Sequence, residues 1–422
     1  MKLTLFLFLS LFSIIISQSQ TFNDGILEYT VTDATNNFVS VKKYNNNCPT
    51  SNLVIPENVT DNSITYTITS IADFGFSNCS SLTNVLLPNG INRIGSAAFR
   101  NSTALITINF PSSLTYIDAE AFSGCSSLTN LTFPSGLTNL QSKAFKDCTS
   151  LTQIMLPDSI TYLGLQVFMG CTDLTTVNLS NGLSSINGSV FYGCTSLINV
   201  TIPDNITTIG TYGFYGCINL TDIILPPNLD IIADVAFFGC TSLSSINFPE
   251  TLTSIGVQSF FNTNLNSISI PSSVTTIKSE AFKSCDNLTN VSVNWNNPLA
   301  IDADVFDNVP INTIPLTVPA GTIPDYQAAP VWQDFESFNE LSISDFELAE
   351  SISLYPNPTS DILRIELNQI SALKKVLIYN HLGQIVSEED TTKIDVSNYS
   401  KGMYFAQIET TLGKSVKKFI VK

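Results

Sequence analysis

Apolar side chains recur with one fixed period along most of the chain. Phenylalanine marks one phase of this period: it first recurs in even steps of twenty-three positions, from Phe76 to Phe260, and then twice more after slightly uneven steps. These positions are Phe76, Phe99, Phe122, Phe145, Phe168, Phe191, Phe214, Phe237, Phe260, Phe282 and Phe306. Because each window repeats the same pattern, we expect each window to form one equivalent structural unit.

Each window also predicts the same local structure. In the window after Phe122, apolar residues stand at Leu128, Leu131 and Phe133, and Pro134 follows them. The alternation at the end of this segment predicts a short strand with its apolar side chains inward. Proline cannot donate to a strand ladder, so the strand ends there. The Ala-Phe segment that comes next suits a tight turn or a single helical turn on the opposite side. One window buries too little to fold alone, so the windows are expected to stack as a solenoid.

The pattern Leu-x-x-Ile-x-Leu-Pro, then Leu-x-x-Ile, then Ala-Phe-x-x-Cys resembles the BspA-type leucine-rich repeat. Clear copies are Leu128–Cys148 and Leu220–Cys240, and the resemblance covers about residues 53–293. It implies a leucine-rich-repeat solenoid of about ten coils, with a parallel sheet on one face and short turns or helical turns on the other. Proteins of this family are typically located at the cell surface and bind other macromolecules or cells.

Six segments are expected along the chain. A charged start is followed by the stretch Leu3–Ile16, whose residues are all apolar, Ser or Thr. This stretch predicts a secretory signal peptide and is shorter than the about 20 residues of a membrane helix. The flanks of the array resemble caps, which stop an end coil from exposing an apolar face and an unpaired edge. The expected segments are a signal peptide (1–19), an N-terminal β cap (20–69), the solenoid (70–293), a C-terminal cap (294–338), an acidic linker (339–350) and a small β-sandwich (351–422).

The last segment resembles the type A sorting domain of the type IX secretion system. Its alternating segment Asp361–Leu367 predicts a half-buried strand, and the period of the preceding array is absent from it. The resemblance implies export across the outer membrane of a Bacteroidetes bacterium, with the secretion machinery as partner. Its motifs serve recognition and not chemistry. They place the sorting signal at Tyr355, Pro356, Asn357, Pro358, Gly383, Gly402, Tyr404, Lys418 and Lys422.

Eight of the nine cysteines stand three residues after a repeat phenylalanine, which predicts one cysteine per coil. Stacked coils would bring neighbouring Cα atoms within reach of a disulfide, but parallel Cβ vectors disfavour that bond. Small buried thiols are preferred over metal binding or redox chemistry, because Ser102 and Thr263 occupy the same slot in two coils. A disulfide between Cys48 and Cys79, joining the N-terminal cap to the first coil, is the less favoured alternative.

Charge and composition exclude several functions. The net charge is −17, so the basic footprint of a nucleic-acid-binding protein is missing. His381 is the single histidine, so a metal site built from several histidines is excluded, and a surface turn suits it better than a catalytic triad. Asp302, Asp304 and Asp307 resemble part of a calcium loop but lack its glycine and distal glutamate. We expect no enzyme, no cofactor and no metal site.

Outward positions of the predicted strands carry mostly small uncharged polar residues, with Leu86, Met155 and Ile224 as interruptions. Two interpretations stay open: a hydrogen-bonding platform for a protein or polysaccharide, or a surface that only keeps the sheet soluble. The main hypothesis is a secreted or cell-surface, non-enzymatic binding protein. A structural spacer without a specific ligand is the first alternative, and a polymer-acting hydrolase the second. The candidate ligand-binding residues are Thr107, Asn109, Asn130, Thr132, Gln153, Thr176, Asn178, Asn199, Thr201, Asp222, Ser245 and Asn247.

Overall fold

The computed structural model describes residues 20–341, 352–367, 373–380, 384–410 and 413–422, the side chains of 413 and 414 excepted. The expected signal peptide and most of the expected acidic linker lie outside these ranges, as do Gly383 and His381. The described chain forms two compact units, which are treated separately. The first comprises residues 20–266, 273–287 and 304–309, and the second comprises the remaining described residues from 267 onward.

The first unit begins with a β-rich cap. Its strands β1, β2 and β3 pair antiparallel, β5 pairs antiparallel with β6, and β3 lies parallel to β6. Strand β6 then pairs parallel with β8 of the first coil, so the cap covers an edge that the coils would otherwise expose. The elements are β1 (Thr21–Asn23), β2 (Leu27–Asp33), β3 (Phe38–Lys43), a 3-10 turn (Tyr44–Asn46), β4 (Ser51–Val54), β5 (Asn58–Asp61) and β6 (Ile64–Ile71).

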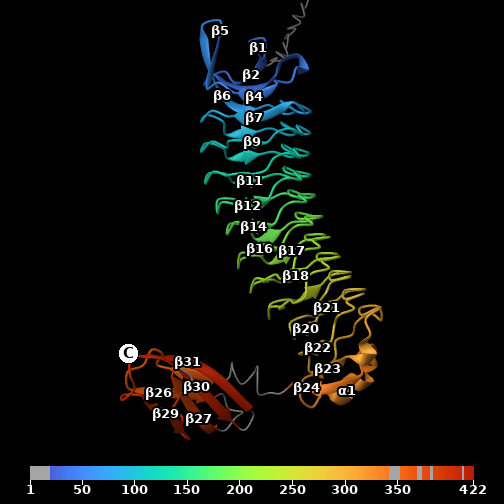
Figure 1. Ribbon diagram of the computed structural model, residues 1–422, viewed down its shortest axis with the longest axis vertical. Coiled ribbons are helices and arrows are strands. Elements are labelled where there is room, and N and C mark those ends of the chain that lie inside the picture. Colours follow the sequence, from blue (N-terminus) through green and yellow to red (C-terminus); the bar gives the residue numbers. More distant parts are fainter. Residues whose placement is uncertain (1–19, 342–351, 368–372, 381–383, 411–412) are drawn as a thin grey trace, which may run out of the picture. The chain divides into compact units, whose positions relative to one another are not determined.

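The coils stack on one another (Figure 1), and parallel strands pair between coils at two phases of the repeat, which form two ladders. The first ladder holds the predicted strands, which begin six to eight residues after the repeat phenylalanine in the coils that form them. The cap strand β4 pairs with β7 and β7 with β9, and β12, β14 and β16 form a separate three-stranded sheet at the same phase of later coils. Its coil strands in this unit are β7 (Leu82–Leu86), β9 (Thr107–Ile108), β12 (Gln153–Met155), β14 (Thr176–Asn178) and β16 (Asn199–Thr201).

A second ladder lies seventeen residues after most of the repeat phenylalanines, where sequence analysis expects only turns. In each of its two-residue strands the second side chain is buried, as Ile117 and Leu140 show. These strands are β8 (Arg93–Ile94), β10 (Tyr116–Ile117), β11 (Asn139–Leu140), β13 (Tyr162–Leu163), β15 (Ser185–Ile186), β17 (Thr208–Ile209), β18 (Ile231–Ile232), β19 (Ser254–Ile255) and β21 (Thr276–Ile277). Two residues per strand are too few to show the period of a strand in sequence.

The repeat phenylalanines form one continuous column inside the solenoid, which confirms the predicted equivalence of the windows. Neighbouring rings lie 5.2–5.9 Å apart, centroid to centroid, and are nearly parallel. Ten of them, from Phe76 to Phe282, are fully buried. Turns hold the column in place. The residue two after the phenylalanine has a positive φ in most coils, which Gly170 adopts without strain and Asn101 tolerates.

The second unit contains a parallel sheet and a helix. Its strands follow the order β20-β22-β23-β24. Tyr326 and Trp332 are fully buried here, and each donates a hydrogen bond of 2.7 Å, to the carbonyls of Trp295 and Leu299 respectively. The elements are β20 (Ser267–Ile270), β22 (Asn290–Val293), a 3-10 turn (Ile311–Thr313), β23 (Pro315–Val318), α1 (Ile323–Ala328), a 3-10 turn (Trp332–Asp334) and β24 (Ser337–Glu340).

The C-terminal part of the same unit is a small antiparallel β-domain, as predicted. One sheet has the order β25-β26-β29 and the other β28-β27-β30-β31. The alternating segment predicted as a half-buried strand is β26, in which Leu363 and Ile365 are buried in the core. The strands are β25 (Ile352–Tyr355), β26 (Ile362–Leu367), β27 (Leu373–Asn380), β28 (Ile385–Glu389), β29 (Lys393–Asp395), β30 (Gly402–Thr410) and β31 (Gly413–Val421).

Candidate binding face on the parallel strands

At the phase of the first ladder, each coil presents two outward side chains, one on either side of a buried one. The surface made by these outward side chains is called the strand face. In β12, Ile154 points inward and is buried, whereas Gln153 and Met155 on either side of it are exposed. The register carries this arrangement from coil to coil, because Gln153 pairs with Thr176 and Thr176 with Asn199. Side chains of one row therefore lie side by side along the stack.

The predicted ligand-binding residues lie on this face as the alternation implies. Eleven of the twelve are exposed, and Asn178 is half-buried. Seven lie in or directly after the strands β9, β12, β14 and β16. The other five occupy the same phase of coils whose backbone forms no strand there: Asn130, Thr132, Asp222, Ser245 and Asn247.

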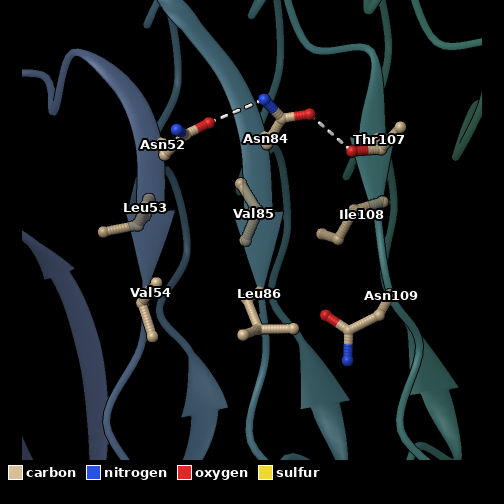
Figure 2. Close-up of a pocket in the computed structure, with 9 residues that line it drawn as sticks. All are labelled: Asn52, Leu53, Val54, Asn84, Val85, Leu86, Thr107, Ile108 and Asn109. Carbon is tan, nitrogen blue, oxygen red and sulfur yellow. Dashed lines mark hydrogen bonds between the residues drawn. The ribbon is translucent and has the colours of Figure 1, made fainter.

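At the N-terminal end of the strand face, a chain of hydrogen bonds joins three strands (Figure 2). The hydroxyl of Thr107 donates to Oδ1 of Asn84 at 2.7 Å, and Nδ2 of Asn84 donates to Oδ1 of Asn52 at 2.7 Å. Asn109 is used differently. Its Oδ1 accepts from the backbone N–H of Leu87 at 2.6 Å and its Nδ2 donates to the carbonyl of Leu87 at 2.9 Å. Asn109 therefore completes the pairing of two coils with its side chain, although sequence analysis assigns it to ligand binding.

A shallow groove of about 520 Å³ runs across these three strands. One wall is the hydrogen-bonded row that begins at Asn52, and the other is an apolar ridge of Val54 and Leu86, which are 63% and 54% exposed. Figure 2 shows the two rows above and below the middle row, whose side chains are buried and form the floor. The lining residues are Asn52, Leu53, Val54, Asn84, Val85, Leu86, Thr107, Ile108 and Asn109.

Most of this groove could not be predicted from the repeat. The repeat begins at Phe76, so Asn52 and Val54 of the cap strand β4 fall outside the predicted face. In the sequence Leu86 interrupts the polar pattern, whereas the structure places Leu86 beside Val54 as a continuous ridge. The alternation of Asn52, Leu53 and Val54 was the available signal, since Leu53 lies in phase with the buried positions of the coils.

The middle of the strand face has a different character. Gln153, Thr176, Asn199 and Thr201 are exposed, and within the described ranges none of their side chains has an intramolecular hydrogen bond. Their amides and hydroxyls are therefore free to bond to water or to a ligand. Met155 adds an apolar side chain, 63% exposed, to the same patch.

The strand face is almost free of charge. Asp222 is the single charged residue at the outward positions of β4, β7 and the coils up to Asn247, in a chain whose net charge is −17. Charged groups gather instead at the turns beside the phenylalanine column. There Lys283 binds Glu280 at 2.8 Å and Asp307 at 2.9 Å, and Arg100 binds Glu120 at 3.0 Å.

The column of cysteines follows the favoured interpretation of small buried thiols. Seven cysteines are free and buried, and each donates its S–H to the carbonyl of the phenylalanine one coil earlier; for Cys194 and Phe168 the distance is 3.2 Å. Burial raises the pKa of the Cys194 thiol to about 12. Ser102 fills the slot in another coil and makes the same bond, to the carbonyl of Phe76, at 2.8 Å.

The expectation for Cys48 and Cys79 is wrong, because these two residues form a disulfide. The argument from parallel Cβ vectors applies only between equivalent coil positions. Cys48 lies in a loop of the cap, just before β4, so the geometry of the repeat does not fix the direction of its side chain. The side chain bonds to that of Cys79, with 5.2 Å between the Cα atoms. The bond joins the cap covalently to the first coil.

The aspartates that resemble a calcium loop have other partners. Asp304 accepts a hydrogen bond from the hydroxyl of Ser279 at 2.6 Å, and Asp307 pairs with Lys283. Among the residues that the structure describes, no group of three or more His, Cys, Asp or Glu side chains is arranged to hold a metal ion.

The predicted sorting residues at the two ends of the C-terminal domain lie together. Oδ1 of Asn357 accepts from the N–H of Ile420 at 3.0 Å, and its Nδ2 donates to the carbonyl of Lys418 at 3.1 Å. Thr359, which is buried, exchanges backbone hydrogen bonds of 2.8 Å with Ile420 and Lys422. The Pro-Asn-Pro segment, which contains Pro356 and Pro358, is thereby tied to the last strand.

The other predicted sorting residues that the structure describes lie in the same domain. Tyr404 is buried and donates from its hydroxyl to the carbonyl of Ser400 at 2.8 Å, while Gly402 pairs with Val421. Tyr355 ends β25 and is exposed, as are Lys418 and Lys422.

Comparison with known proteins accounts for both parts of the chain. The model of the BspA type leucine rich repeat region matches in six copies over residues 39–175, 93–220 and 207–327. The chain belongs to the BspA-type leucine-rich repeat proteins. A second model, the secretion system C-terminal sorting domain, matches residues 353–422. With its BspA-type repeats and its sorting domain, the chain is a secreted or cell-surface protein.

One solved structure supports the fold of the repeat array. A leucine-rich repeat protein from Bacteroides ovatus is 25% identical with a TM-score of 0.55, and the match covers 76% of each chain. The T. pallidum leucine-rich repeat protein is 26% identical with a TM-score of 0.42, over 48% of this chain and 92% of that one. In the described part of the BspA-type chain, no helix is both long and apolar enough to cross a membrane.

One curated relative is similar over a short stretch. Ulvan lyase NLR42 of Nonlabens ulvanivorans is 38% identical over 73 residues, which are 16% of this chain. The BspA-type chain spans 13% of the length of that enzyme.

Proposed function

We propose that this protein is a non-enzymatic binding protein that recognises a macromolecule through its strand face and reaches the cell exterior through the type IX secretion machinery. The observation that carries the proposal is the patch at Gln153, Thr176 and Asn199. These side chains are exposed, aligned in one row, and without intramolecular hydrogen bonds in the described structure. A surface kept only for solubility does not need such an aligned row, since scattered charges would serve.

The proposed ligand is an extended protein surface or a polysaccharide. The row recurs from coil to coil, so the hydrogen-bonding groups repeat along the stack at the spacing of strands in a sheet, about 4.8 Å. A long ligand can bond to several coils at once, and weak single contacts then add to a useful affinity.

The binding test replaces Thr176 and Asn199 by aspartate in the full chain. A neutral ligand cannot compensate for the cost of removing water from two charges at the centre of the strand face. The variant protein should therefore no longer be retained on cells, glycans or matrix proteins. The matched control places the same charges at Thr161 and Asn205, which are exposed outside the strand face. If both variants bind as the unaltered protein does, the strand face is not the binding surface and the solenoid is better described as a spacer.

The export test removes residues 351–422. Without them we expect the protein to be missing from the cell surface and the medium, because the proposed export route requires the secretion machinery to recognise this domain. A milder variant, Asn357→Ala, removes the two hydrogen bonds that tie the Pro-Asn-Pro segment to the last strand. Surface display of the deletion variant at the normal level would contradict the proposed export route.

A further inference from the structure

We infer that the groove formed by Asn52, Val54, Asn84, Leu86 and Thr107 binds a neutral polysaccharide, whose uncharged pyranose rings lie along the solenoid axis. This inference rests on the proposed function, since it names the class of ligand that the strand face takes and adds a subsite built partly by the cap. The chemistry of the two walls, the repeat of the strands and the absence of charge point to this ligand.

The two walls of the groove match the two sides of a sugar ring. A pyranose presents polar hydroxyls at its edge and C–H groups on its faces. The row of Asn52, Asn84 and Thr107 faces the ligand with amide and hydroxyl groups, while Val54 and Leu86 offer an apolar ridge opposite. A ring held between them satisfies its hydroxyls on one side and buries C–H surface on the other.

The polar wall is oriented before any ligand binds. Because the Thr107 hydroxyl donates to Asn84 and the Asn84 amide donates to Asn52, all the bonds of this row run in one direction. Neither proton of the Asn52 amide donates within the described structure, so this amide can donate, and the Thr107 oxygen can accept. Sugar hydroxyls do both, and a wall that is already ordered loses little entropy on binding.

The axial repeat also suits a polysaccharide. Strands β4, β7 and β9 bring equivalent residues past one another at about 4.8 Å. An extended β-linked pyranose chain advances by a similar length for each sugar, so that consecutive sugars can meet equivalent groups on consecutive strands. The groove volume of about 520 Å³ lies within the range of ordinary ligand sites.

Charge and residue type separate this ligand from two others. An anionic polymer needs Lys or Arg, and the outward positions of the strand face up to Asn247 carry neither. A protein partner usually depends on Trp, Tyr or Arg at the centre of the interface, and these are missing from the same positions. Amides, hydroxyls and a few aliphatic side chains remain, and they favour a neutral, hydroxyl-rich chain.

The experiment measures retardation of the purified full chain in native gels that contain one polysaccharide each. The neutral probes are glucomannan and xyloglucan, and the anionic probes are alginate and chondroitin sulfate. We expect retardation by a neutral probe only, and we expect it to persist to about 0.5 M salt, because no ion pair contributes.

Two matched pairs of variants locate the site. Leu86→Asp should weaken binding of the neutral probe by about tenfold or more, since it places a charge on the apolar ridge. Leu165→Asp changes a leucine of nearly equal exposure, 53% against 54%, that lies outside the strand face, and should leave binding within about twofold. Asn52→Ala and its control Asn205→Ala test the polar wall in the same way. Circular dichroism confirms that each variant is folded.

The outcomes distinguish the inference from the proposed function. Equal retardation by alginate, or equal binding by the Leu86→Asp and Leu165→Asp variants, overturns the inference. If no neutral probe binds but a matrix protein binds and is lost in the Thr176 and Asn199 double variant, the inference fails while the proposed function stands. If neither glycans nor matrix proteins bind the full chain, both fail.

Discussion

Removing one ring from the phenylalanine column tests the basis of the whole fold. Phe145 is fully buried and lies 5.2 Å from Phe122 and 5.8 Å from Phe168, ring to ring. It also meets the edge of Phe133 at 5.7 Å. The substitution Phe145→Ala therefore leaves a cavity in the middle of the column and interrupts three aromatic contacts.

The expected cost is about 3–5 kcal/mol in the free energy of unfolding, the usual range for a buried phenylalanine changed to alanine. The upper half of the range applies here, because coils above and below hold the neighbouring rings in place and the cavity cannot collapse. Phe238→Ala is the matched control. Phe238 is also stacked, at 4.5 Å from Phe261 and 5.0 Å from Tyr215, but it is only half-buried, so we expect about 1 kcal/mol.

Urea unfolding followed by circular dichroism gives the loss of stability, and hydrogen exchange read by mass spectrometry shows where it falls. In a solenoid each coil contacts mainly its neighbours, so exchange should rise first in the coils around Phe145. If Phe145→Ala costs no more than Phe238→Ala, or if exchange rises evenly along the array, the stacked column does not stabilise the coils as argued here.

Three further predictions concern the cysteines. Cys194→Ser should change the unfolding free energy by less than about 1 kcal/mol, because Ser102 makes the same bond in its own coil. Cys194→Val removes the thiol bond to the Phe168 carbonyl, which keeps only its bond from the N–H of Cys171, and should cost more than Cys194→Ser in a urea titration. Burial raises the pKa of Cys194 from 9.0 to about 12, so the contribution of this thiol to stability is fully present below pH 9 and is lost progressively toward pH 12. Iodoacetamide at pH 8 should modify the seven buried thiols only after unfolding. Modification of the native protein would contradict their burial. Cys48→Ser should lower the free energy of unfolding by about 2–4 kcal/mol, because it removes the disulfide to Cys79. Hydrogen exchange should then become faster in the cap alone. Unchanged exchange in the cap would show that the disulfide adds no stability.

The sequence by itself determines the repeated features of this protein. The fixed period of the phenylalanines predicts one equivalent coil per window, and alternation assigns Ile154 inward and Gln153 outward, as the structure shows. Both follow from local rules, since a side chain in a strand must point to one face or the other. The strands of the sorting domain were predictable for the same reason.

Tertiary structure decides what depends on residues that are distant in sequence and break the repeat. The disulfide of Cys48 needs a cap loop whose path no period describes. The groove arises because the cap strand β4 adds Asn52 and Val54 to the first coil. Asn109 has the residue type and the outward position expected of a ligand-binding residue. Its amide nevertheless bonds to the backbone of the preceding coil. A local pattern states which face a side chain takes, whereas its partners depend on how neighbouring coils are packed, and only the folded chain brings those coils together.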